Sequence, residues 1–70
     1  MKINDEVKIK DKSKVDNDKL LDSEALSIIK ASNYQGAITK ISDGIFFVGF
    51  KNVKGWVTHG FKSNEIEVVK

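Results

Sequence analysis

The stretch GAITKISDGIFFVGFK, residues 36–51, decides the fold class of this chain. Two runs rich in apolar residues, 36–42 and 45–51, are joined by Asp43 and Gly44. An Asp-Gly pair between two such runs is the strongest short-range signal of a β-hairpin. The sequence therefore predicts two antiparallel strands joined by a tight turn.

Strands are also expected at both ends of the chain. Residues 5–11 alternate strictly, which places Val7 and Ile9 on one face and lysines on the other. Residues 65–69 alternate in the same way, and we expect Ile66 and Val68 to point inward. The sequence therefore predicts a first and a last strand, each with one buried face.

Between the hairpin and the last strand the pattern is less regular. Residues 52–55 indicate a second, longer turn in which Gly55 supplies a positive φ, and residues 56–58 form a short fourth strand. Residues 59–64 contain too many turn formers for a strand, and we expect Phe61 to anchor one turn of 3₁₀ helix there. Five short strands of this kind predict a mainly β protein, a small barrel whose closure removes exposed edges.

The insertion after the first strand is predicted to hold one short helix. Residues 11–18 are dense in charge and are expected to form a solvated loop. Residues 22–30 begin with Asp22 as a possible N-cap, carry Glu24 in the first turn, and space their apolar residues as a helix does. The alternative is a strand through residues 25–29, because Ser27, Ile28 and Ile29 are not strong helix formers.

Length and composition exclude several classes of site. Seventy residues suffice for one domain, residues 1–70, with a small core. The chain has no cysteine and one histidine, so no metal site or cofactor is expected. No catalytic constellation is visible, which predicts a protein that is not an enzyme. The longest apolar run is far too short to span a membrane and no signal peptide is evident, so we expect a cytoplasmic protein.

Charge is unevenly distributed along the chain. Residues 15–35 carry two lysines and four acids, whereas residues 36–62 carry four lysines and one acid. All twelve basic residues are lysine. Because bidentate reading of guanine favours the arginine fork, a base-specific reader of nucleic acid is not expected. The distribution predicts a basic barrel with an acidic insertion.

Together these segments resemble a known family. The first strand with Val7 and Ile9, the Asp43-Gly44 hairpin, the apolar run 46–48, the pair Trp56-Val57 and the closing strand 65–69 look like the SH3-like barrel of KOW-type domains. More closely, they resemble small stand-alone SH3-like proteins encoded by Gram-positive bacteria and their phages. The resemblance implies a five-stranded SH3-like barrel, with the short helix in the long loop after the first strand.

Two groups of side chains are candidate contact residues. One group is aromatic or lies beside aromatic residues in the predicted loops, and it is expected to bind a protein: Tyr34, Trp56, His59 and Phe61. The other is a series of lysines, which at period two would share one side of an extended chain and could contact a phosphate backbone: Lys8, Lys10, Lys12 and Lys14, with Lys40, Lys51, Lys54 and Lys62 as a possible extension. The alternative for the lysines is a solvated strand face.

The hairpin strand 45–51 has bulky apolar groups on both faces. Alternation places Phe46, Val48 and Phe50 on one side and Ile45 with Phe47 on the other. We expect the predicted helix to cover the surplus face; otherwise that face remains an exposed patch that can bind a partner.

The sequence thus predicts a non-catalytic binding module of a bacterial or phage accessory protein, which engages a larger protein through the aromatic group. The alternative function is binding of a DNA or RNA backbone through the lysines. No membrane and no small-molecule substrate is expected as a partner.

Overall fold

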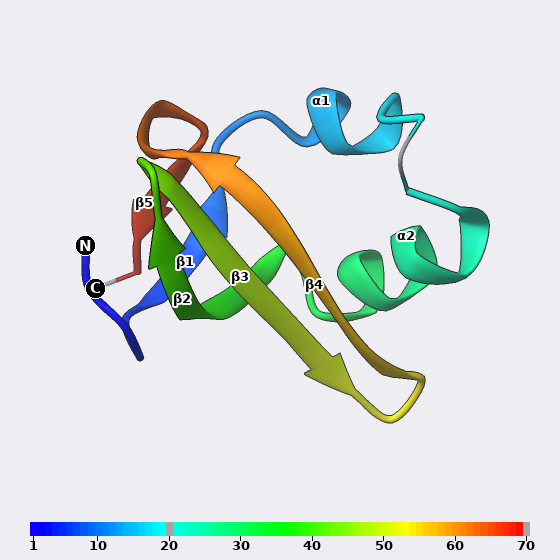
Figure 1. Cartoon of the computed structure of the whole chain (residues 1–70). Coiled ribbons are helices and arrows are strands. Elements are labelled where there is room, and N and C mark those ends of the chain that lie inside the picture. Colours follow the sequence, from blue (N-terminus) through cyan, green and yellow to red (C-terminus); the bar gives the residue numbers. More distant parts are fainter. Residues whose placement is uncertain (20, 70) are drawn as a thin grey trace.

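The computed structural model describes residues 1–19 and 21–69, and its strands form one five-stranded antiparallel sheet (Figure 1). In chain order the elements are β1 (Glu6–Ile9), α1 (Lys12–Asp16), α2 (Ser23–Ala31), β2 (Gln35–Ser42), β3 (Ile45–Asn52), β4 (Gly55–Lys62), the 3₁₀ helix η1 (Ser63–Glu65) and β5 (Ile66–Val68). The strands lie in the order β4-β3-β2-β1-β5. The mainly β class and the five strands are confirmed. Within the described residues β4 and β5 end the order without pairing to each other, so the sheet is open and hydrogen bonds do not close it into a barrel.

Two tight turns shape the central meander. Asp43 and Gly44 have φ values of 52° and 77°, the positive values that a type I′ hairpin turn requires, so the predicted hairpin is confirmed. At the second turn Asn52 pairs with Gly55. Only two residues separate this pair, so the turn is shorter than predicted. Gly55 does adopt a positive φ, 134°.

Strand β4 is longer than the sequence predicts. It continues through the supposed turn formers as far as Lys62 and pairs with β3 along its whole length. The reason lies in packing: Phe61 is buried, and a Cβ atom on Gly60 would lie 2.7 Å from Cγ2 of Ile45. Gly60 therefore permits close packing inside a strand. The 3₁₀ turn follows one step later, where the Lys62 N–H donates to Oε1 of Glu65 at 2.7 Å.

Helix α2 agrees with its prediction, and the strand alternative for residues 25–29 is wrong. Oδ1 of Asp22 accepts a hydrogen bond from the Ala25 N–H at 2.8 Å, which satisfies one of the free amide groups of the first turn. Ile28 and Ile29 are buried. Two to three turns are not stable alone in water, so this buried stripe holds the helix in place.

The loop predicted for residues 11–18 is wrong in its central part, because α1 forms there. Oδ1 of Asp11 accepts hydrogen bonds from the Ser13 N–H at 3.0 Å and the Ser13 hydroxyl at 2.6 Å, and so caps the helix. Val15 is 2% exposed and joins the core. One apolar residue and one cap suffice for a single turn of helix on the protein surface.

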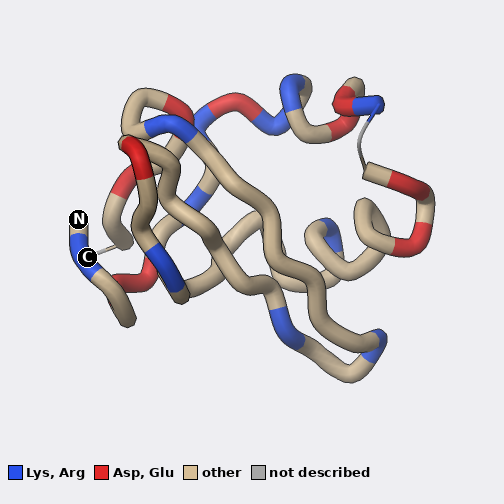
Figure 2. The backbone as a smooth tube through the Cα atoms, in the orientation of Figure 1, with Lys and Arg blue, Asp and Glu red and all other residues tan. Residues whose placement is uncertain are grey.

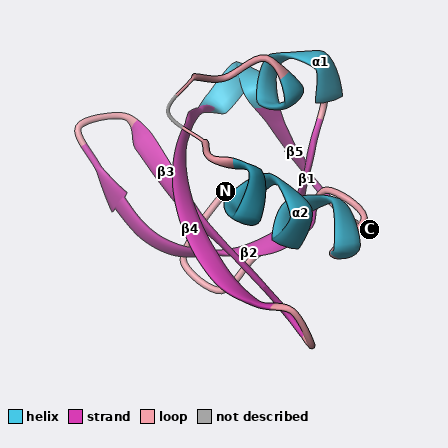
Figure 3. Ribbon diagram, turned by 90° about the vertical axis from the view of Figure 1, so that its right-hand side faces the viewer, coloured by secondary structure: helices cyan, strands magenta, loops and turns pink. Residues whose placement is uncertain are grey.

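The core lies between the inner face of the sheet and the helices. Its buried members come from every strand and both α-helices: Val7, Ile9, Val15, Ile28, Ile29, Ile38, Val48, Phe50, Phe61 and Ile66. Helix α2 packs against β3 and β4 (Figure 3), on the face that carries Val48 and Phe50. The helix therefore does not cover the opposite face with Ile45 and Phe47, as we expected it to. Val68 shares the side of Ile66 but remains 41% exposed, because it lies at the end of the outermost strand.

Polar side chains fasten the helical segment to the sheet at two points. The Asn52 amide donates to the carbonyl of Ile28 at 2.8 Å and to the Ser32 hydroxyl at 2.6 Å, which links the β3–β4 turn to the end of α2. Nε2 of His59 lies 3.1 Å from Oδ2 of Asp18, which links β4 to the segment between the two helices. Both contacts connect the long insertion to the hairpin it covers.

Candidate binding surface

The outer face of β2, β3 and β4 carries aromatic rings and lysines side by side. Cross-strand pairs share a face, and the register pairs Lys40 with Phe47, Lys51 with Trp56, and Ile45 with Lys62. We call this surface the lysine–aromatic face; its members are Thr39, Lys40, Ile45, Phe47, Gly49, Lys51, Trp56, Thr58, Gly60 and Lys62. It is the side of the sheet that α2 leaves uncovered.

The lysines of this face have no acidic partner in the part of the chain that the structure describes. Within residues 1–19 and 21–69, no carboxylate oxygen lies within 4.0 Å of the ammonium groups of Lys40, Lys51 and Lys62. Nζ of Lys40 instead lies 5.8 Å from the ring centroid of Phe47, within reach of a cation–π contact. The face therefore presents positive charge beside one exposed ring, Trp56, and one half-buried ring, Phe47.

Trp56 forms one wall of a shallow groove in this face. The indole side chain is 69% exposed, and the groove, about 260 Å³ in volume, is lined on its other sides by Thr39 and Thr58. Gly49 lies at its floor, where a Cβ atom would come within 3.1 Å of Cγ2 of Thr39. The methyl group of Thr39 thus packs over Gly49, and the groove beside the indole has small side chains around it.

The four aromatic-group candidates do not form one surface. Trp56 lies on the outer face, whereas Phe61 is 4% exposed in the core and His59 packs edge-on against it at 5.1 Å between ring centroids. Tyr34 lies elsewhere, beside α1, where its hydroxyl donates to Oδ1 of Asp16 at 3.1 Å. Of the four, Trp56 alone is exposed on the lysine–aromatic face.

The lysine series from the first strand is divided between two elements. β1 ends at Ile9, so Lys12 and Lys14 belong to α1 and do not continue the strand face. Lys8, Lys10 and Lys12 instead surround a polar pocket of about 340 Å³. Two of these lysines already have neighbours: Nζ of Lys8 lies 3.4 Å from Oε1 of Glu67, and Nζ of Lys12 lies 5.0 Å from the ring centroid of Tyr34.

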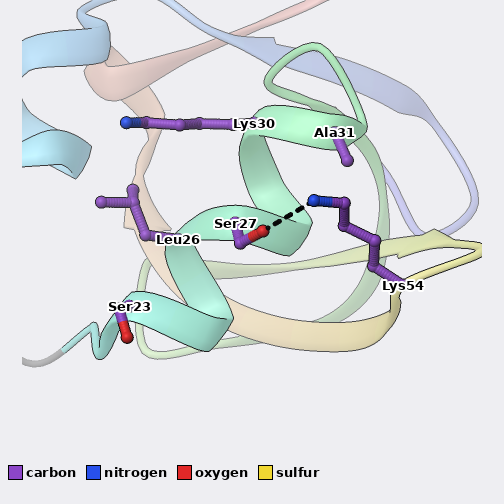
Figure 4. A pocket seen from close by; sticks show the side chains of 6 residues that line it. All are labelled: Ser23, Leu26, Ser27, Lys30, Ala31 and Lys54. Carbon is purple, nitrogen blue, oxygen red and sulfur yellow. Dashed lines mark hydrogen bonds between the residues drawn. The ribbon is translucent and has the colours of Figure 1, made fainter.

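Another pocket, about 560 Å³ in volume, lies on the exposed side of α2 (Figure 4). Nζ of Lys54 reaches across it to the Ser27 hydroxyl at 3.2 Å, while Lys30 extends away from that contact. Lys54 is thus directed toward the helix. Ser23 also lines the pocket, and within the described residues no histidine or carboxylate is hydrogen-bonded to either serine hydroxyl.

The turn of the β3–β4 hairpin carries no acidic residue. Figure 2 shows lysines at that end of the hairpin, whereas acidic residues lie along the segment that holds the two helices and at the opposite end of the sheet. Hydrogen bonds from the Ser13 hydroxyl and N–H hold the pKa of Asp11 below its usual value. Burial, followed by the hydrogen bond to Asp16, raises the pKa of Tyr34. Asp11 precedes α1 and Tyr34 follows α2, so both shifted groups lie at the ends of the helical segment and are not members of the lysine–aromatic face.

Sequence reasoning named Trp56, Lys40 and Lys51, and named Lys62 only as an extension of a stripe, but it did not join them. The signal that could have joined them is the alternation of side chains along each strand, combined with the pairing between strands. Because β4 continues to Lys62, its outward-facing residues lie opposite Phe47 and Gly49 of β3, and the lysines share that face. The prediction that β4 ends at Thr58 hid this arrangement.

Comparison with known proteins adds no relative, because neither a family model nor a curated protein nor a solved structure matches this chain. Among the described residues, no three histidine or acidic side chains are grouped so as to hold a metal ion. None of the described helices is long and apolar enough to cross a membrane.

Proposed function

We propose that this chain is a non-catalytic binding module of the SH3-like type, and that it binds single-stranded nucleic acid on the lysine–aromatic face. The observation that carries the proposal is that Lys40, Lys51 and Lys62 share the outer face with the exposed ring of Trp56, which lies directly opposite Lys51. Among the described residues these lysines have no acidic partners. Proteins that bind single strands combine a positive surface that follows the backbone with aromatic rings on which bases stack. The SH3-like assignment rests on five short antiparallel strands with a 3₁₀ turn before the last.

Stacking is supported by the shape of the groove at Trp56. A base that enters beside the indole meets Gly49, which has no side chain, and the small side chains of Thr39 and Thr58. Stacking on an aromatic side chain accepts any base, because every base has a π-face. Selectivity for sequence is therefore not expected from this groove.

The kind of cation supports the same class of ligand. Lysine offers a compact point charge, which suits contact with phosphate but does not match the bidentate edge of guanine. Contacts to phosphate fix position and affinity, and they carry no sequence information directly. We therefore propose a binder of the single-strand backbone with little preference for sequence.

A protein partner is the second candidate, favoured by one observation. Trp56 is both large and 69% exposed, and tryptophan is enriched among the residues that dominate protein–protein interfaces. In that case the indole would fill a pocket of the partner, and the lysines would lie at the rim of the contact.

Salt dependence separates these two candidates. We expect a fluorescently labelled oligothymidine of about ten nucleotides to bind, with log K falling against log salt at a slope of about −2 for three lysine contacts. The double variant Lys51→Gln/Lys62→Gln should flatten this slope, and the matched variant Lys8→Gln/Lys10→Gln should not. No binding at low salt, or an equal effect of both variants, would contradict the proposal and leave the protein partner as the remaining candidate.

A further inference from the structure

β4 is a long edge strand whose outer row of backbone groups is open. It pairs with β3 on one side and ends the strand order on the other. The pair Asn52 and Gly55 flanks a two-residue turn, and such flanking pairs are hydrogen-bonded to each other. Because hydrogen-bonded and non-hydrogen-bonded pairs alternate, Trp56, Thr58 and Gly60 direct their N–H and C=O groups away from β3.

These outward groups have no partner within the part of the chain that the structure describes. No backbone hydrogen bond outside the sheet involves Trp56, Thr58 or Gly60. The next outward group, the N–H of Lys62, is capped by Oε1 of Glu65 at 2.7 Å. The open row therefore ends where η1 begins.

The sequence of the edge strand offers little of the usual protection against pairing, although the first turn of α2 lies beside Trp56 and Val57. Natural edge strands are short, or carry charged residues, proline or bulges. β4 has eight residues, and no residue from Gly55 to Phe61 is formally charged when His59 is neutral. The strand at the other end of the sheet, β5, has three residues and carries Glu67. One end of the sheet is protected and the other is suited to pairing.

We infer that β4 pairs with β4 of a second copy of this chain, antiparallel and centred on Thr58. This register places Thr58 opposite Thr58 of the second copy and Trp56 opposite Gly60 of the second copy. These residues all belong to the outer face. The indole of each copy therefore lies opposite Gly60 of the other copy, which has no side chain, and beside Phe47 of that other copy. Each facing pair exchanges two backbone hydrogen bonds.

Charge does not oppose this pairing at its ends. The register brings residue 54 of one copy near residue 62 of the other, and both residues are lysine. Lys54, however, is directed to Ser27 on the inner side of the sheet, whereas Lys62 is on the outer face. A contact made by part of one strand buries little surface, so the dimer is weak and forms only at high concentration.

Amide hydrogen exchange tests the pairing directly. We expect a concentration series from about 10 μM to about 1 mM, a range that spans weak association, to convert a monomer to a dimer in sedimentation. The amides of Trp56, Thr58 and Gly60 should gain protection with concentration, while those of Val57, His59 and Phe61 should be protected throughout. A monomer across the whole range, or a dimer whose even-numbered β4 amides still exchange fast, would overturn the inference.

A pair of charge variants supplies the control. Thr58→Lys sets two like charges opposite each other at the centre of the proposed contact and should abolish dimerisation. Thr39→Lys adds the same charge to another exposed position of the outer face and should leave dimerisation intact. Equal dimerisation of the two variants would contradict the pairing. The readout for both variants is the oligomeric state and not nucleic-acid binding, because Thr39 and Thr58 line the groove at Trp56.

Discussion

The two halves of the outer sheet surface use charge in different ways. On β1 and β5, Lys8 faces Glu67 at 3.4 Å and has Glu6 on the same side of the strand, so positive and negative groups are mixed. On β2, β3 and β4 the charged groups of the outer face are lysines, and they lie beside the exposed ring of Trp56 and the half-buried ring of Phe47. The first arrangement is typical of a solvated face. The comparison teaches that the count of lysines is less informative than what lies beside each one.

The largest effect is expected from a substitution in β2, the strand that joins the two halves of the sheet. Gly36 pairs with Val7 of β1, and a Cβ atom there would lie 2.8 Å from Cγ1 of Val48 and closer still to the backbone oxygen of Gly49. Since a backbone atom cannot move aside alone, Gly36→Ala should lower the free energy of unfolding by about 3 kcal/mol, measured by urea denaturation.

Gly44→Ala is the matched control for this change. A Cβ atom at Gly44 meets nothing within 4 Å, and only the positive φ of 77° is strained. The expected loss is about 1 kcal/mol. Similar losses for the two variants would show that β2 does not pack against β3 as closely as described.

The next largest effect is expected when the exposed ring of the lysine–aromatic face, Trp56, is removed. Trp56→Ala should weaken oligothymidine binding by about 1–3 kcal/mol, roughly 5- to 150-fold, because one stacked base is lost. The unfolding midpoint should stay nearly unchanged, since the side chain is 69% exposed. Val53→Ala, in the adjacent turn and fully exposed, should leave affinity unaltered. Fluorescence anisotropy measures both; equal affinities of the two variants would exclude Trp56 from the site.

How much of this arrangement could be predicted from sequence depends on the range of the interactions involved. The Asp43-Gly44 turn and the Asp22 cap of α2 are local, and both were predicted correctly. The full length of β4 is set by contacts between Gly60 and residues of β3, which no local pattern reveals. α1 depends on the burial of Val15 against distant strands. The lysine–aromatic face was therefore recognised only in part, because its register requires the whole of β4.

A smaller effect is expected from a single lysine of the face. Lys40→Gln should reduce the steepness of the salt dependence by about 0.7, the value for one phosphate contact on a single strand. Lys8→Gln removes the same charge from the β1–β5 half, where Glu67 already neutralises it. Its slope should equal that of the unmodified chain, and a parallel decrease in both variants would show that the two halves do not differ in binding.

The smallest effect is expected in the β1–β5 half, where Lys8 is paired with Glu67. Glu67→Gln frees Lys8 from its partner and should change the free energy of unfolding by less than about 1 kcal/mol, because the pair is solvent-exposed. Oligothymidine affinity should not rise, since no exposed ring lies on that strand pair. A clear gain in affinity would mean that an unpaired lysine is sufficient, and that the rings of β3 and β4 add nothing.

The Asn52 amide, bonded to both Ile28 and Ser32, has a consequence for the thermodynamics of recognition. It fixes the tip of the β3–β4 hairpin, next to the strand positions of Lys51 and Trp56, to the end of α2. A tip that is already rigid before a ligand arrives loses little conformational entropy on complex formation. Little of the free energy gained from the contacts is then offset by the cost of ordering the protein. A surface of only a few side chains can therefore act as a preorganised receptor.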